Sequence, residues 1–171
     1  LMVLSVMVGA IAFSGSAAAD PVGNSDLTSG SVTPTEVIDQ NVTHSVSFTV
    51  RNITADGTQD QFKFTTGVSS ATVKSISDVR VVNASGDSVT SGKTLPNITA
   101  NPASAEADAS GIANLTVSAD VEVNYDGADG NSDLKVQVFD NSTSAISATG
   151  IGSQINVSDT TKRSAPGTGA G

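Results

Sequence analysis

This chain of 171 residues contains several short runs in which apolar and polar residues alternate, and these runs limit its possible folds more than any other pattern in the sequence. The longest run is residues 115–123, LTVSADVEV, and residues 46–51 alternate in the same way. Phe62 and Phe64 also share one side of a short run. Successive side chains of a β-strand point to opposite sides, so such runs bury one face and leave the other in water. The pattern predicts antiparallel sheets that each cover a core on one side.

Less regular alternation predicts further strands near residues 73–81, 133–139 and 151–157, the last preceded by Ile146. We expect 133–139 to form a hairpin with 115–125. No sustained helical periodicity follows Ala19, so little helix is expected. The sequence therefore predicts an all-β, immunoglobulin-like β-sandwich with Greek-key connections. The breaks between the runs are turn dipeptides such as Asp56-Gly57, Ser91-Gly92, Asp126-Gly127 and Asp129-Gly130.

The first 19 residues, LMVLSVMVGAIAFSGSAAA, are apolar and end in small residues before Asp20-Pro21. A short apolar run followed by an A-x-A site is typical of a secretory signal peptide. We predict cleavage after Ala19. The run is too short for a membrane span, which needs about 20 apolar residues, so none is expected in the mature chain. The alternative is a packing helix retained in a filament subunit.

This segment resembles the end of the signal peptide of haloarchaeal surface-layer glycoproteins. The resemblance covers residues 1–19 only, and it implies a secreted cell-surface protein of a halophilic archaeon. The remaining residues agree with it independently, because all 17 acidic residues follow Ala19 and the net charge is -9. Repulsion among carboxylates is largely screened in molar salt, where the Debye length is about 3 Å. The alternative is an ordinary acidic secreted domain.

Asparagine forms the second clear pattern, the acceptor sequon N-x-S/T. One sequon means little, but several in one small exported domain favour N-linked glycans, which are bulky and lie on the surface. The alternative is chance, since Asn, Ser and Thr are abundant here. The candidate glycosylation sites are Asn41, Asn52, Asn83, Asn97, Asn114, Asn141 and Asn156.

A short acidic segment is the one candidate metal site. Asp126, Asp129, Asn131 and Asp133 offer oxygen ligands around glycines, and Ca²⁺ takes six to eight such ligands in a flexible loop. The segment is not an EF-hand loop, because Leu134 stands where a glycine is needed. We therefore expect either a calcium loop or an acidic hairpin tip that needs no ion.

Composition excludes much other chemistry. The absence of cysteine excludes thiolate metal sites and cysteine catalysis, and the single His44 excludes multi-histidine metal sites. We expect His44 to be a solvated residue at a strand edge. Eight basic residues without a cluster argue against nucleic-acid binding. The chain is predicted to be no enzyme and to require no cofactor, although a hydrolase using two aspartates stays an alternative.

These observations lead to one predicted organisation and function. Residues 20–40 would form a polar segment or edge strand, 41–159 the β-sandwich, and 160–171 a flexible tail or linker. We predict a structural cell-surface glycoprotein that assembles with itself or with neighbouring surface glycoproteins into a coat or filament. The alternative is a non-catalytic binding or adhesion module of a larger secreted protein.

Overall fold

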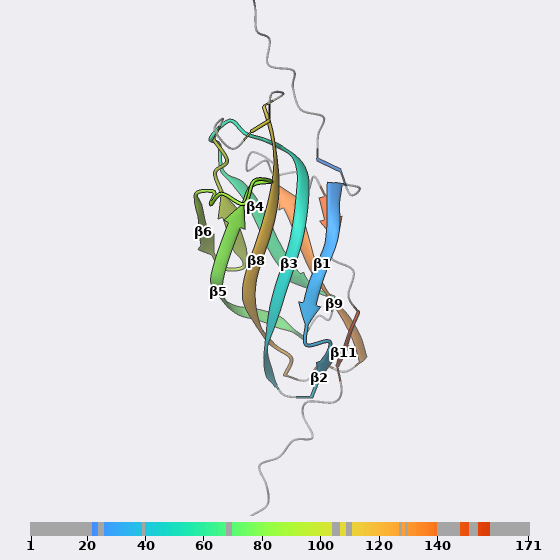
Figure 1. Cartoon of the computed structure of the whole chain (residues 1–171). Helices are drawn as coiled ribbons and strands as arrows, with labels where there is room; N and C mark the ends of the chain where they lie inside the picture. The colour runs from blue at the N-terminus through green and yellow to red at the C-terminus, as the bar shows by residue number, and fades with distance from the viewer. Residues whose placement is uncertain are drawn as a thin grey trace, which may run out of the picture.

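The computed structural model describes residues 22–23, 26–38, 40–67, 70–103, 107–108, 111–126, 128, 130–139, 148–150 and 154–157. The expected signal peptide, the expected C-terminal tail and Ile146 lie outside the described residues. The described strands form two sheets that pack face to face (Figure 1). No helix among these residues has the length and apolar character needed to cross a membrane.

The first sheet has four strands in the order β1-β3-β8-β5, all paired antiparallel. They lie side by side at the front of Figure 1, with the long β3 and β8 in the centre. The register joins Asn41 to Asn124 at one end of this central pair and Val50 to Leu115 towards the other. The strands are β1 (Leu27–Thr33), β3 (Asn41–Thr54), β5 (Thr72–Val82) and β8 (Ile112–Asn124).

The second sheet has seven strands in the order β2-β11-β9-β4-β7-β6, with β10 also paired to β9. Its pairings are antiparallel except for the short contact between β2 and β11. The strands are β2 (Glu36–Val37), β4 (Asp60–Thr66), β6 (Ser91–Thr94), β7 (Asn97–Ala100), β9 (Gly130–Phe139), β10 (Ala148–Gly150) and β11 (Gln154–Val157).

This strand order is that of an immunoglobulin-like sandwich. The first sheet reproduces the A-B-E-D order, and β4, β9 and β10 stand where strands C, F and G would be. The β6–β7 hairpin is an addition, because it follows the D-like β5 and extends the second sheet beside β4. The predicted all-β, immunoglobulin-like Greek-key sandwich is confirmed.

The expected hairpin between 115–125 and 133–139 is wrong. β8 belongs to the first sheet and β9 to the second, so the acidic segment between them crosses from one sheet to the other. Both edges of β8 are already occupied, by β3 and β5. The next strand must therefore pair elsewhere, and it pairs with β4. A turn dipeptide marks the end of a strand but does not show which sheet the following strand joins.

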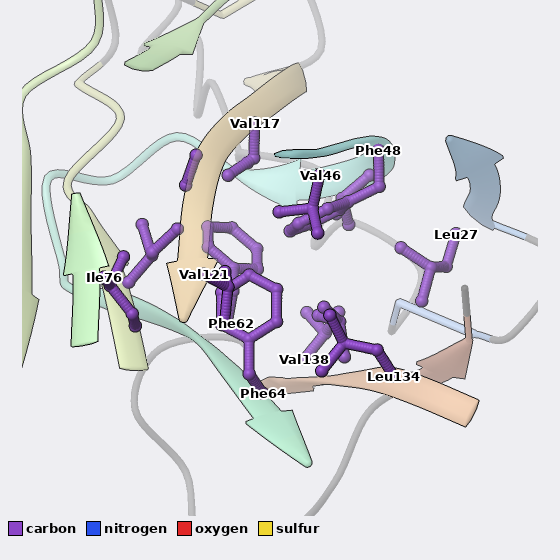
Figure 2. Packing of buried hydrophobic residues seen from close by; sticks show 14 of the residues in the cluster. Leu27, Val46, Phe48, Phe62, Phe64, Ile76, Val117, Val121, Leu134 and Val138 are labelled. Atoms are coloured by element: carbon purple, nitrogen blue, oxygen red, sulfur yellow. The ribbon is translucent and has the colours of Figure 1, made fainter. Parts of the chain in front are cut away.

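The core lies between the two sheets, where the predicted alternation places its apolar residues. Val46, Phe48 and Val50 of β3 are buried, and so are Phe62 and Phe64 of β4. Figure 2 shows labelled side chains of the two sheets pointing toward one another. The Phe48 ring meets the other two edge to face, with centroid distances of 5.7 and 6.3 Å. Each such pair stabilises the fold by about 0.5–1.5 kcal/mol beyond the area it buries.

The weak alternation in residues 73–81 has a structural cause. The pairing of β5 with β8 shifts register between Val73 and Ser75 and again between Ser77 and Arg80. Asp78 lies in the second irregularity with a left-handed φ of 50°. Each bulge inserts an extra residue and breaks the period of two. Ile76 and Val81 consequently both face the core, although they are five positions apart and a regular strand would put them on opposite faces.

Candidate functional site

The outer side of the first sheet carries small polar side chains, and we call it the hydroxyl face. Successive side chains of β3 and β8 point to opposite sides of the sheet. Every second one is buried in the core, and the side chains between them are at least partly exposed on the hydroxyl face. The hydroxyl face consists of Thr43, Ser45, Ser47 and Thr49 of β3 with Thr116, Ser118, Asp120 and Glu122 of β8.

Cross-strand hydrogen bonds connect this face. The Ser45 hydroxyl donates to Oδ1 of Asp120 at 2.7 Å. On the other side of β8, the Ser75 hydroxyl of β5 donates to Oε2 of Glu122 at 2.9 Å. Such pairs each contribute about 0.2–1 kcal/mol to sheet pairing. Hydrogen bonds between neighbouring strands thus connect polar side chains of the hydroxyl face.

Two predicted glycosylation sites lie at opposite ends of the hydroxyl face. Asn41 begins β3 and Asn114 lies near the start of β8, and both side chains are exposed. Oδ1 of Asn41 accepts a hydrogen bond from Nδ2 of Asn124 at 2.8 Å. Asn114 lies ten residues from Asn124 along β8, so the two sites are about 33 Å apart. Their side chains lie on the same side of the sheet.

Asn83 lies in a different environment, because it is only 8% exposed. Its Oδ1 accepts hydrogen bonds from the backbone N–H groups of Ser85 at 3.0 Å and Asp87 at 2.9 Å. The backbone of Asn83 closes the same turn by donating to the carbonyl of Asp87. Asparagine commonly organises turns in this way, so the fold itself accounts for this residue.

Asn52 also has a structural role. It lies at the register shift of β3 with a left-handed φ of 60°, a conformation that asparagine tolerates better than most residues. Its Nδ2 donates to Oδ1 of Asp26 at 2.6 Å, which connects β3 to the segment just before β1. The side chain is half-buried.

The remaining three sequons are less fully defined. Asn97 lies half-buried in β7, and its Oδ1 is enclosed without a hydrogen-bond partner. Asn156 belongs to β11, where only the backbone is described. Asn141 lies outside the described residues. Glycosylation at the seven sites therefore stays a prediction, and the structure separates the sites by exposure and hydrogen bonding.

The predicted calcium segment is described only in part. Asp126 is exposed, and its backbone N–H donates to Oδ1 of Asn124 at 3.0 Å. Asp129 and the side chains of Asn131 and Asp133 lie outside the description. Among the residues that the structure describes, no group of three His, Cys, Asp or Glu side chains gathers in one place. The calcium site stays a prediction.

The expectation that His44 is solvated is wrong, because His44 is fully buried. Its Nδ1 lies 2.8 Å from the carbonyl oxygen of Pro34, and its Nε2 lies 2.7 Å from the hydroxyl of Tyr125. A carbonyl only accepts, so Nδ1 carries the hydrogen and Nε2 accepts from the tyrosine. The alternation of β3 could have revealed this, since residue 44 is in phase with Val46 and Phe48.

Burial shifts the ionisation of both members of this pair. Burial lowers the pKa of His44 below its usual 6.5, while the bond to the Pro34 carbonyl raises it in part. Burial also raises the pKa of Tyr125 to about 12. Both groups are therefore neutral near pH 7. With both ring nitrogens already bonded, His44 connects β3, the segment before β2 and the end of β8 as a structural residue.

A shallow groove of about 340 Å³ opens between the end of β4, the start of β5 and the β6–β7 turn. Leu95 at its rim is 52% exposed, one of two large apolar side chains exposed among the described residues. The groove is lined by Phe64, Thr65, Thr66, Ala71, Thr72, Val73, Leu95 and Pro96.

Comparisons with known proteins add one similarity. No family model matches the chain, and no curated protein matches its sequence. Among solved structures, the chain is similar to the N-terminal domain of the Streptococcus gordonii adhesin Sgo0707, with 15% sequence identity and a TM-score of 0.49. The similarity covers 75% of this chain and 32% of that one.

Proposed function

We propose that this chain is a secreted, N-glycosylated domain of the cell surface of a halophilic archaeon, with a structural role in a coat or filament. The observation that carries the proposal is the placement of Asn41 and Asn114, two exposed sequon asparagines at opposite ends of one polar sheet face. Glycans at these two positions would keep that face in solvent. Contacts with other subunits would then use sheet edges, loops and the second sheet.

Charge supports the same proposal. The chain carries 17 acidic and 8 basic residues, so copies of it repel one another in dilute buffer. Molar salt screens this repulsion. Association between copies is therefore expected in brine, and calcium bound near Asp126 would strengthen it.

Sedimentation velocity tests the proposal on protein exported from a halophilic archaeal host. We expect large assemblies in molar NaCl with Ca²⁺, and dissociation when the salt is diluted. A matched sample with a chelator separates calcium bridging from screening alone. A monomer under all of these conditions would contradict the structural role.

The groove beside Leu95 favours a second candidate function, a binding or adhesion module of a larger secreted protein. An exposed leucine beside Phe64 and Val73 offers an apolar contact for a ligand. This alternative expects a monomer in brine. Loss of ligand binding in Leu95→Ser, with unchanged thermal stability, would favour it.

A further inference from the structure

We infer that the folded protein carries N-linked glycans at Asn41 and Asn114 and none at Asn83 or Asn52, so that the sugars gather on the hydroxyl face. The inference rests on the proposed function for the presence of an N-glycosylating pathway. It goes further by assigning the sequons to two classes. In one class the side chain is free to be modified, and in the other the fold already uses it.

The chemistry of the modification sets the structural requirement. The donor is an oligosaccharide linked through phosphate to a lipid. A bond forms between Nδ2 of asparagine and the anomeric carbon of the sugar, and the bond from that carbon to the phosphate oxygen breaks. The amide loses one hydrogen as a proton, and the lipid phosphate leaves with the electron pair. The modified Nδ2 must therefore lie where a sugar ring can project into solvent.

Asn41 meets this requirement. Its side chain is exposed, and its hydrogen bond to Asn124 uses Oδ1. Neither hydrogen of its Nδ2 is needed for that bond. Thr43, which completes the sequon, is exposed on the same side of β3. A glycan on Asn41 would leave the register of β3 and β8 intact.

Asn114 also meets the requirement for a solvent-exposed side chain. Its position affects whether Asn83 could carry a glycan. A hollow of about 140 Å³ at the end of the first sheet is lined by both asparagines together with Ala107, Asp108 and Ile112. Asn114 is exposed at this hollow, whereas Asn83 is only 8% exposed. A glycan that leaves Asn114 would cover the hollow, and there is little room for a second one from Asn83.

Asn83 and Asn52 are held by the fold. Oδ1 of Asn83 receives two backbone N–H groups of its own turn, which fixes the amide in a buried position. A sugar attached before folding would have to be accommodated there, so folding would select unmodified chains. Nδ2 of Asn52 lies 2.6 Å from the Asp26 carboxylate in a half-buried bulge, where a sugar would crowd the carboxylate.

The test is intact-mass and glycopeptide mass spectrometry of the full chain exported from a halophilic archaeal host. Four proteins are compared: wild type, Thr43→Ala, Asn114→Gln and Ser85→Ala. Thr43→Ala destroys the first sequon and keeps the Asn41–Asn124 hydrogen bond. Ser85→Ala is its matched control, because it destroys the Asn83 sequon and keeps both backbone donors to Asn83.

We expect Thr43→Ala and Asn114→Gln each to lose the mass of one glycan, and Ser85→Ala to lose none. A glycan lost in Ser85→Ala, or found on the Asn52 peptide, would overturn the inference and leave the proposed function standing. Glycans found only on asparagines other than Asn41 and Asn114 would also overturn the inference and leave the proposed function standing. A chain without any glycan would overturn both the inference and the glycoprotein part of the proposed function, whereas sedimentation tests assembly separately.

Discussion

Asparagine at the residue scale has two separate roles in this chain. The side chains of Asn41 and Asn114 are exposed, while those of Asn83 and Asn52 shape the backbone at a turn and a bulge. The sequon motif is the same in all four cases. The sequence therefore predicts all seven sites equally, and exposure together with hydrogen bonding separates these four.

Replacement of Asn83 by alanine should destabilise the domain by about 1–2 kcal/mol, because two backbone N–H groups lose their acceptor. Asn83→Asp keeps an oxygen in the same place and should cost much less. Urea unfolding in molar salt measures both variants. Equal stability of Asn83→Ala and wild type would contradict the role of this side chain.

Acid should weaken the domain through His44. Its pKa is lowered by burial in the fold, whereas the unfolded chain has the usual value near 6.5. The unfolded state then binds more protons between these two values. Stability is thus fully present above about pH 6.5 and falls as the pH drops through the lowered folded-state pKa. Urea midpoints between about pH 7.5 and pH 5 give the profile for wild type.

His44→Gln provides the comparison, because it removes the titrating group. Its unfolding free energy should depend less on pH over the same window than that of wild type. Tyr125→Phe keeps the buried histidine and should retain the pH dependence, with a loss of about 1 kcal/mol from the missing hydroxyl. Parallel profiles for wild type and His44→Gln would refute this explanation.

Strand β1 shows at the element scale how one residue can decide a pairing. Gly30 lies at a register shift between β1 and β3, and a Cβ atom built there would lie 1.1 Å from the backbone oxygen of Ser47. Only glycine fits such an approach without movement of the backbone. β1 also brings Leu27 and Val32 into the core, so its attachment matters for the whole sandwich.

Gly30→Ala should therefore separate part of β1 from β3 and destabilise the domain by about 2–3 kcal/mol. Gly92→Ala in β6 is the matched control, since its added Cβ meets only the Thr99 hydroxyl, at 3.1 Å. Hydrogen exchange of the β3 amides, read together with urea unfolding, distinguishes the two. Similar exchange in both variants would contradict the close approach at Gly30.

The alternation of apolar and polar residues predicted the buried faces of the strands better than the turn dipeptides predicted how the strands pair. The regular runs of β3, β4 and β8 correctly identify buried Val46, Phe48 and Phe62. The phase of β3 puts His44 on the same buried side, although we expected His44 to be solvated. The pairing of β9 with β4 could not be predicted, because the partner of a strand depends on which strand edges are already paired in the fold. The bulges of β5 arise from its pairing with β8. They interrupt the alternation of apolar and polar residues, so the sequence pattern does not reveal where they lie.

At the scale of the whole molecule, net charge should govern stability. The chain has a net charge of -9. Folding brings its carboxylates closer together, and they repel one another in the compact state. The melting temperature should rise from dilute buffer to molar NaCl, because salt screens that repulsion. The rise should shrink near pH 4, where carboxylates begin to be protonated. A melting temperature that does not change with salt near pH 7 would count against salt adaptation.

Electron microscopy of the native protein, isolated from its source in high salt with Ca²⁺ present, is the decisive experiment for the proposed structural role. The proposed structural role predicts a lattice or filament built from one type of subunit. It also predicts extra density at Asn41 and Asn114, on the side of each subunit away from its neighbours. Dispersed single domains, or an assembly whose contacts cover the hydroxyl face, would contradict it.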